Sequence, residues 1–277
     1  MTFYAINGSP RKRGNTAVLL DKALQGVKDV IPDGDTKIIH VYDYSYTGCV
    51  SCYACKRKGG KYYGRCAKKD AISSLLPELS QADGLIIGSP VYFHSLTGQL
   101  QAFLERLLYP YLAYGKEYYS IAPKQMPVAF VYTMNATEEK AQQMNYQIKL
   151  SPMEEYAGVV FSPPAVLYCY DTCQFDDYKR YMAQRFSEEK KLQRRQEHFP
   201  IDCENARGMG RAMAQRLQVR IPLPKEVLAE FDELNLVGVK ITVVQRYQII
   251  GMKFIIILNK DLLQDALPQF GGDSALV

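Results

Sequence analysis

Residues 7–16, Asn-Gly-Ser-Pro-Arg-Lys-Arg-Gly-Asn-Thr, decide the fold of this chain. They follow the apolar run 2–6 and precede the helical pattern 17–24, so the sequence predicts a strand, a loop and a helix. Gly8 and Gly14 permit close backbone approach, and the helix N-terminus adds N–H groups with partial positive charge. Such a loop can bind a phosphate. Because it lacks the Gly-rich patterns that bind dinucleotides and nucleoside triphosphates, a mononucleotide phosphate is favoured over a pyrophosphate or a triphosphate. The alternative is an ordinary turn and helix N-cap.

Short apolar runs alternate with helical patterns along the chain. Five runs rich in β-branched or aromatic residues predict buried strands, at 2–6, 37–42, 84–87, 128–132 and 165–170. Apolar spacing of three and four predicts helices at 17–30, 71–80, 98–108, 138–149, 175–195 and 203–219. This alternation indicates an α/β fold, a doubly wound five-stranded parallel sheet in the order 2-1-3-4-5. The core domain is expected to span residues 1–220.

The composition changes after Ile221-Pro-Leu-Pro224, where a C-terminal extension of residues 221–277 begins. Two apolar runs, 237–244 and 247–258, look like strands. A hairpin with so much apolar surface needs a partner, either the edge of the main domain or another subunit. The extension is therefore predicted to be a hairpin or a dimer-contact arm.

Composition and charge narrow the class of protein. The chain has 277 residues, is 47% hydrophobic and carries a net charge of +5, which is too small an excess to indicate a nucleic-acid partner. The apolar run 249–258 is far shorter than the ~20 residues of a membrane-spanning helix. No secretion signal opens the sequence. We therefore expect a cytoplasmic protein without a membrane span and without a nucleic-acid partner.

A second loop is expected beside the first. In an open parallel sheet, ligands bind beyond the carboxyl ends of the strands where the strand order reverses, here between strands one and three. The third strand ends in Ser89-Pro-Val-Tyr-Phe-His94, a proline turn with two aromatic side chains. The fourth strand brings Thr133-Met-Asn-Ala-Thr137 to the same edge. A flat ring could lie there, with polar groups at its edge.

The segments Gly8-Ser-Pro-Arg-Lys-Arg-Gly-Asn-Thr16 and Gly88-Ser-Pro-Val-Tyr-Phe93, with Leu96-Thr-Gly-Gln-Leu100, resemble the flavodoxin-like family of NAD(P)H-dependent FMN reductases. The resemblance implies a flavodoxin-like, FMN-binding domain over roughly the first 220 residues. It implies that the FMN phosphate is held by Ser9, Arg11, Asn15 and Thr16. It implies that the isoalloxazine ring is lined by Pro90, Val91, Tyr92 and Phe93, with Thr133 and Asn135 at the ring edge.

Catalysis in such a protein is carried by the flavin, so no catalytic side chain is expected. His94 departs from the family pattern, which commonly has a small residue after the aromatic pair. A histidine here is either a proton donor or an ordinary hydrogen-bonded loop residue.

Four cysteines lie on the loop after the second strand. Cys49, Cys52 and Cys55 are spaced C-x2-C-x2-C, and Cys66 follows after ten intervening residues. Three thiols at this spacing can surround one cubane cluster, and the fourth can complete its coordination. The segment resembles the iron-sulfur flavoproteins, although the gap before the fourth cysteine is longer here. A [4Fe-4S] cluster is favoured, with free thiols, zinc or a disulfide as alternatives.

The surroundings of these cysteines are basic and aromatic. Seven lysines and arginines between residues 56 and 69 form either a docking face for an acidic partner or a solvated loop. The chain has 21 tyrosines and no tryptophan, and several tyrosines gather at 109–119. Because tyrosine is enriched at interfaces, we expect this segment to contact a second subunit in a homodimer or higher homo-oligomer.

These patterns predict an oxidoreductase. FMN would take electrons from NAD(P)H or from a ferredoxin-type donor and pass them to an acceptor that the sequence does not name. Two other classes stay open. One is an electron carrier with FMN and an iron-sulfur cluster but no small-molecule turnover, and the other is a redox or metal sensor that uses the cysteines as its switch.

Overall fold

A five-stranded parallel sheet forms the centre of the fold. The computed structural model describes residues 1–218, 242–243 and 256–257. The sheet consists of β1 (Thr2–Asn7), β2 (Asp35–His40), β3 (Gly84–Pro90), β6 (Val128–Thr133) and β7 (Ala165–Cys169), in the order β2-β1-β3-β6-β7. All four pairings are parallel. Because β6 and β7 are the fourth and fifth strands of this sheet, the predicted doubly wound order 2-1-3-4-5 is confirmed.

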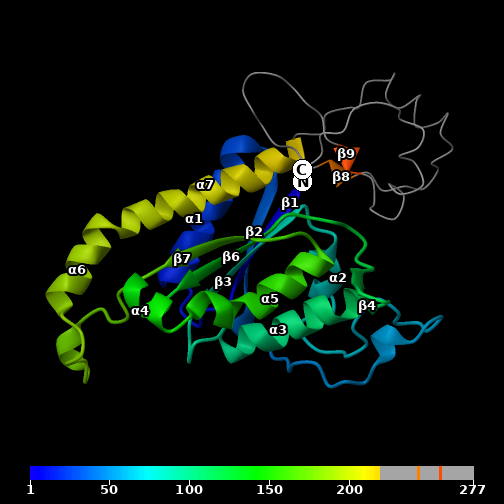
Figure 1. Cartoon of the computed structure of the whole chain (residues 1–277), viewed down its shortest axis with the longest axis horizontal. Coiled ribbons are helices and arrows are strands. Elements are labelled where there is room, and N and C mark those ends of the chain that lie inside the picture. Colours follow the sequence, from blue (N-terminus) through cyan, green and yellow to red (C-terminus); the bar gives the residue numbers. More distant parts are fainter. Residues whose placement is uncertain (219–241, 244–255, 258–277) are drawn as a thin grey trace, which may run out of the picture. The chain divides into compact units, whose positions relative to one another are not determined.

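Helices cover both faces of the sheet (Figure 1). One face carries α1 (Asn15–Val30) and α7 (Phe199–Gln218), which pack on Phe3 and Ala5 of β1. The other carries α2 (Leu75–Ser80), α3 (Gly98–Leu108) and α5 (Tyr146–Val160), which pack on Tyr4 and Ile6. Successive side chains of a strand point to opposite faces, so one short apolar run supplies both cores.

The two helices α1 and α7 touch through their backbones. A Cβ atom added to Gly210 would lie 1.8 Å from the carbonyl oxygen of Ala23, and one added to Gly26 would lie 1.9 Å from that of Arg207. No side chain fits at either position. Arg207 and Arg211 both pair with Asp29 at the exposed edge of this contact, at 2.7 and 3.1 Å.

Two predicted helices differ from the structure. The pattern 138–149 is divided into α4 (Glu138–Gln143) and α5, because Asn145 between them adopts a left-handed conformation with φ 53°. The pattern 175–195 contains only the short helix η4 (Tyr178–Arg180) and then α6 (Glu188–Glu197), whose N-cap is Ser187. Asx and serine side chains that bond to nearby backbone amides end or start helices at such points.

The tyrosine-rich segment forms a small antiparallel hairpin outside the main sheet. A short helix, η3 (Tyr109–Tyr111), leads into β4 (Leu112–Tyr114) and β5 (Tyr118–Ser120). The side chains of Tyr114 and Tyr118 are more than half exposed and contact each other edge to face. The predicted subunit contact of this segment stays a prediction.

The chain divides after Val219 into two units. In the second unit the structure describes two short strands, β8 (Thr242–Val243) and β9 (Ile256–Ile257), which pair antiparallel. The rest of the predicted hairpin or dimer-contact arm lies outside the described residues, so its role and the predicted domain organisation stay predictions.

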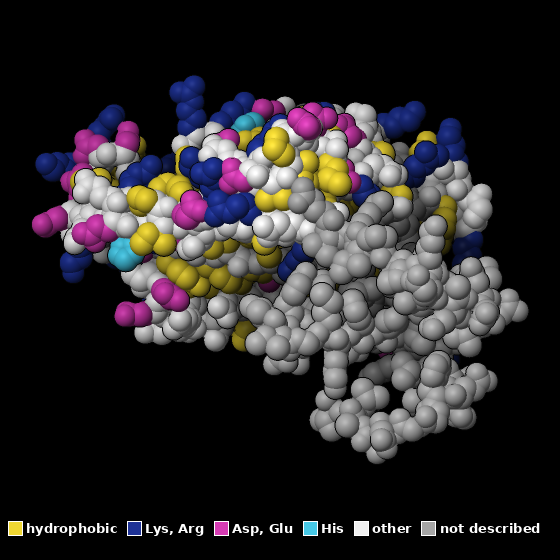
Figure 2. Space-filling view, turned by 90° about the horizontal axis from the view of Figure 1, so that it is seen from above, with side chains coloured by type: hydrophobic (Ala, Val, Ile, Leu, Met, Phe, Trp, Pro, Cys, Tyr) yellow, Lys and Arg dark blue, Asp and Glu magenta, His cyan; other side chains and the backbone are white. Residues whose placement is uncertain are grey.

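No helix in the described residues is both long and apolar enough to span a membrane. Seen from the side of α1 and α7, the surface mixes basic, acidic and hydrophobic side chains, and acidic and basic side chains intermingle at the end near α6 (Figure 2).

Helix α5 carries a partly buried carboxyl group, that of Glu154. Burial raises the pKa of Glu154, and the neighbouring Tyr132 hydroxyl lowers it by a smaller amount. A carboxyl group whose pKa is higher in the folded state than in the unfolded state favours folding while it is protonated, below its unfolded-state pKa. This stability is lost as the pH rises through the folded-state pKa, so at neutral pH the ionised group opposes folding. Glu154→Gln should therefore stabilise the fold at neutral pH, by about 0.5–1 kcal/mol.

The pH dependence of urea unfolding tests this expectation. The gain should disappear below about pH 4, where the wild-type carboxyl is protonated in both states. Glu155→Gln, at the exposed neighbouring position, is the matched control and should stabilise the fold by less, because the Glu155 charge raises the pKa of Glu154 by less than burial does. An equal gain from both substitutions would show that general surface charge is responsible.

Candidate functional site

Three loops meet beyond the carboxyl ends of β1, β3 and β6. We call residues 8–16, 90–97 and 134–137 the first, second and third rim loops. The first two are joined by Gly8, whose N–H donates to the Gly88 oxygen at 2.8 Å and whose carbonyl accepts from the Thr97 hydroxyl at 2.7 Å. A Cβ at Gly8 would lie 2.6 Å from Leu100, so the close approach of the two loops requires glycine.

The first rim loop leads directly into an uncapped helix. Asn7 accepts a hydrogen bond from the Ser9 amide at 3.0 Å, and the Ser9 hydroxyl accepts one from the Arg11 amide at 3.1 Å. Gly14 is the N-cap of α1, and no side chain caps the helix. The first amides of a helix have no carbonyl partner within it, so this turn can bind an anion.

The four predicted phosphate-binding residues all lie at this loop, in different surroundings. Ser9 and Thr16 are buried, and the Thr16 hydroxyl bonds to that of Thr133 at 2.7 Å. Arg11 is exposed, and its guanidinium donates to the Gln174 carbonyl. Asn15 donates to the Cys173 carbonyl at 2.9 Å. The segment after β7 therefore passes close to the first rim loop.

The second rim loop turns sharply and presents aromatic side chains outward. The Val91 amide donates to the Thr133 carbonyl at 2.9 Å, and Tyr92 and Ser95 exchange two backbone hydrogen bonds of 2.9 and 3.0 Å. Between them Phe93 and His94 have positive φ, 48° and 66°. Phe93 is fully exposed and Tyr92 is 46% exposed, which leaves apolar surface at the rim. Pro90 ends β3 beside them.

The third rim loop is fixed by a buried lysine of α6. Lys191, 4% exposed, donates to both oxygens of Asn135, with 2.9 Å to the carbonyl, and pairs with Asp171. Asn135 also donates to Gln174 at 3.0 Å. Lys191 was not predicted as a site residue, because the sequence does not distinguish it from the exposed charged residues of the run 188–197.

A pocket opens beside the third rim loop. Its lining includes two cations and three aromatic side chains, namely Lys140, Arg185, His94, Tyr146 and Phe186. His94 packs edge to face on Tyr146, with 5.1 Å between the ring centres. Its Nδ1 atom is buried and has no hydrogen-bond partner among the described residues. The pocket thus combines positive charge with ring surface next to the second rim loop.

The four cysteines line one pocket on the opposite side of α3 from the sheet's core strands. Cys49 and Cys52 are exposed, Cys66 is half-buried and Cys55 is buried, and all seven cysteines of the described chain are free thiols. Burial raises the pKa of the Cys55 thiol, Lys56 opposes this, and the other three cysteines raise it further.

Four cysteines that line one pocket are a donor set of the kind that iron-sulfur clusters use. No group of three or more His, Cys, Asp or Glu side chains in the described part of the chain is arranged to hold one metal ion. A four-iron cluster distributes its four thiolates over separate iron atoms, so the thiols must surround a space rather than a point. Four cysteines around one pocket meet that requirement.

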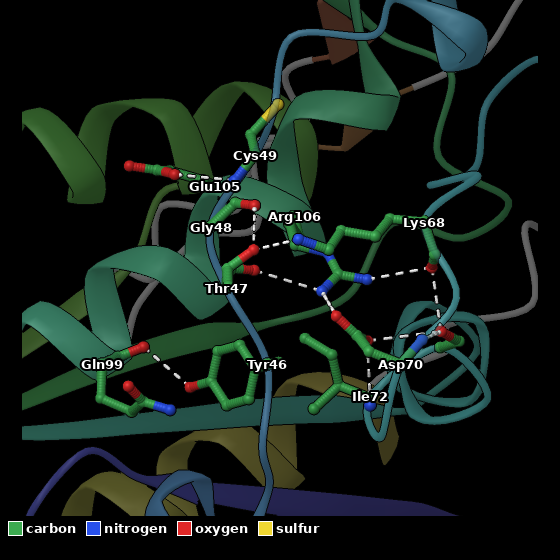
Figure 3. A network of polar contacts seen from close by, with 11 residues as sticks. Tyr46, Thr47, Gly48, Cys49, Lys68, Asp70, Ile72, Gln99, Glu105 and Arg106 are labelled. Atoms are coloured by element: carbon green, nitrogen blue, oxygen red, sulfur yellow. Dashed lines mark hydrogen bonds and ion pairs between the residues drawn. The ribbon is translucent and has the colours of Figure 1, made fainter.

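Two consecutive residues of α3 hold the cysteine segment, which we define as residues 47–70 (Figure 3). Glu105 accepts a hydrogen bond from the Cys49 amide at 3.1 Å. Arg106 is 1% exposed and bonds to both ends of the segment, at the Thr47 and Lys68 carbonyls. Glu105 and Arg106 were not predicted as site residues, because the pattern 98–108 does not distinguish them from other charged residues of an amphipathic helix.

The family model for NADPH-dependent FMN reductases matches residues 1–166, a range that contains all three rim loops and the cysteine segment. The chain belongs to this family. The resemblance expected from the sequence is confirmed.

Several relatives of this FMN reductase family member are called iron-sulfur flavoproteins. One from Methanocaldococcus jannaschii is 35% identical over 107 residues, which is 38% of this chain and 51% of that protein. One from Archaeoglobus fulgidus is 38% identical over 106 residues, covering 38% of this chain and 48% of the relative. The chain thus spans about half the length of the curated relatives that it matches.

Solved structures support the fold. An NAD(P)H:quinone oxidoreductase from Methanothermobacter marburgensis has a TM-score of 0.56 at 13% identity, covering 76% of this chain and 98% of its own. An FMN-dependent NADH-azoreductase from Bacillus anthracis, in complex with FMN, has a TM-score of 0.52 at 9% identity, covering 78% and 99%. At such identities the likeness shows the flavodoxin-like fold alone.

Proposed function

We propose that this chain is an FMN-dependent oxidoreductase that moves electrons from NAD(P)H to an acceptor. The observation that carries the proposal is the meeting of three rim loops beyond β1, β3 and β6, within the range that the family model matches. The uncapped N-terminus of α1 suits a phosphate, and the outward aromatic side chains of the second rim loop suit a flat ring.

In this proposal, the residues of the rim hold and orient the cofactor. Arg11 and Asn15 supply side-chain donors to the phosphate, supported by Ser9, Thr16 and the free amides of α1. The ring contacts come from Pro90, Val91, Tyr92 and Phe93, and the ring edge faces Thr133 and Asn135.

Bound FMN would supply the redox chemistry, in which the nicotinamide is oxidised by loss of a hydride and an acceptor is reduced. The basic pocket beside the third rim loop lies where a negatively charged donor or acceptor could approach. No side chain has to change its own oxidation state in this scheme.

We further propose that Cys49, Cys52, Cys55 and Cys66 hold a [4Fe-4S] cluster. Support comes from the shared pocket, from the donor chemistry and from the names of the relatives that this chain resembles. Such a cluster would make one-electron exchange possible, and a ferredoxin-type donor then becomes an alternative to NAD(P)H.

Anaerobic spectroscopy of the purified chain tests both parts. We expect a flavin spectrum, about one FMN per chain released on denaturation, and bleaching by NADPH or NADH with reoxidation by a quinone. Iron and acid-labile sulfide are expected at about four each per chain. A colourless protein would refute the flavin function.

Other outcomes separate the alternatives. FMN that is reduced by a ferredoxin-type protein but by neither nicotinamide would favour an electron carrier. FMN without iron would remove the cluster and leave the four cysteines as free thiols. Size-exclusion chromatography with light scattering tests the predicted homodimer.

A further inference from the structure

A buried guanidinium connects the two ends of the cysteine segment. Nη1 of Arg106 donates to the Thr47 carbonyl at 3.2 Å, and Nη2 donates to the Lys68 carbonyl at 3.2 Å. These two residues lie 21 positions apart in the sequence, on either side of the four cysteines. Arg106 also pairs with Asp70, whose carboxylate accepts from the Ile72 amide at 3.3 Å. One side chain thereby closes the loop that carries the four thiols (Figure 3).

Burial of the Arg106 charge is unfavourable unless other interactions replace its lost hydration. A guanidinium that is 1% exposed loses its hydration and is tolerated only where charged and polar partners replace the water. Burial tends to raise the pKa of Asp70, but the bonds from Arg106 dominate and the pKa is lowered. The pair is therefore ionised, and the segment on both sides of the cysteines is anchored to α3.

One N–H donor of the Arg106 guanidinium has no hydrogen-bond partner among the described residues. This donor is the buried Nε–H. Arg106 and Cys66 line the same two pockets, one of which contains all four cysteines. Cys66 therefore lines the same pocket as the guanidinium whose buried Nε–H has no partner in the described part of the chain.

We propose that Arg106 is a positioning residue for the iron-sulfur centre, which closes the cysteine segment onto α3 and offers its unpartnered Nε–H to the sulfur of Cys66 when the cluster is bound. The inference rests on the proposed cluster and goes beyond it, because it assigns a residue outside the four ligands. A hydrogen bond and a positive charge beside a ligand sulfur stabilise the more negative, reduced state. Arg106 should therefore raise the reduction potential of the centre.

The conservative variant Arg106→Lys separates positioning from simple folding. It keeps the charge and the stem but loses the planar fork and the Nε donor. We expect it to retain FMN and most of its iron, while the centre becomes harder to reduce. At the wild-type midpoint potential, the ratio of reduced to oxidised centre should fall at least tenfold, as measured by EPR during an anaerobic redox titration.

Arg194→Lys is the matched control, because Arg194 is a largely buried arginine that likewise has one carboxylate partner, Asp202 at 2.8 Å. It should leave the potential of the centre unchanged. An unchanged potential in Arg106→Lys with full iron content would overturn the proposed donation to Cys66. Equal shifts in both variants would overturn it as well.

Hydrogen exchange of the metal-free protein distinguishes this inference from the proposed function. Arg106→Lys should speed amide exchange in residues 47–70 and leave β1 and β3 unchanged. Wild-type protein without iron would refute the cluster and the sulfur contact together. The exchange rates would still decide whether Arg106 closes the segment, and unaltered rates would refute that closure.

Discussion

Replacing Gly210 by alanine is expected to lower the free energy of unfolding by more than about 3 kcal/mol. The new Cβ would lie 1.8 Å from the Ala23 carbonyl oxygen and 2.8 Å from its carbon. Both are backbone atoms in the middle of α1, so no side chain can move aside to make room. The helices α1 and α7 must separate, which exposes the apolar core between them and the sheet.

Gly208→Ala is the matched control in the same helix. Its Cβ would meet nothing closer than an Arg211 side-chain nitrogen at 3.8 Å. Because alanine favours a helix over glycine, this variant should be neutral or more stable by up to about 1 kcal/mol. Urea unfolding followed by circular dichroism measures both. Equal stability of the two variants would contradict the backbone contact.

The double variant Arg11→Ala/Asn15→Ala is expected to release FMN while the chain stays folded. Each side chain contributes a polar donor beside the uncapped start of α1, and hydrogen bonds to charged groups are worth about 1.5–3 kcal/mol. Losing both should raise the Kd for FMN by about 10²–10⁴-fold. Fluorescence titration of the metal-free, flavin-free protein with FMN measures the change.

Lys12→Ala is the matched control on the same loop. The Lys12 ammonium lies 2.7 Å from the Asp43 carboxylate, so its charge is already paired. Its removal should change the affinity for FMN severalfold at most. Tight binding by the double variant would refute the assigned phosphate site. A loss as large in Lys12→Ala would show that net charge, rather than these two donors, binds the phosphate.

The fold was predictable because each strand of the main sheet is a short apolar run that can be recognised from the local sequence. The run 2–6 is apolar on both faces, as a central parallel strand must be, and the following glycine loop and helix determine its direction. The break at Asn145 was not predictable from spacing alone, since apolar residues keep their helical interval across it. The short extent of α6 was missed for a similar reason, because turns around Asp177 compete with the helix.

The parts of the candidate site that are formed by loop backbone could be predicted from the sequence. The parts that depend on contacts between side chains far apart in the sequence could not. The first and second rim loops follow directly from their sequence motifs. By contrast, Lys191 reaches Asn135 across 56 positions, and Arg106 reaches Asp70 across 36. A charged side chain in an amphipathic helix gives no local sign that it is buried. Only the tertiary fold distinguishes such a residue from its exposed neighbours.

Helix α3 belongs to both regions of interest at once. Its N-cap, Thr97, bonds to Gly8 of the first rim loop, and two turns later Glu105 and Arg106 hold the cysteine segment. A helix of 11 residues acts as a short rigid rod of about 16 Å. Order gained at one end therefore reduces the conformational entropy still to be lost at the other. If the proposed cluster and FMN both bind, their binding should accordingly be cooperative, with each cofactor favouring the binding of the other.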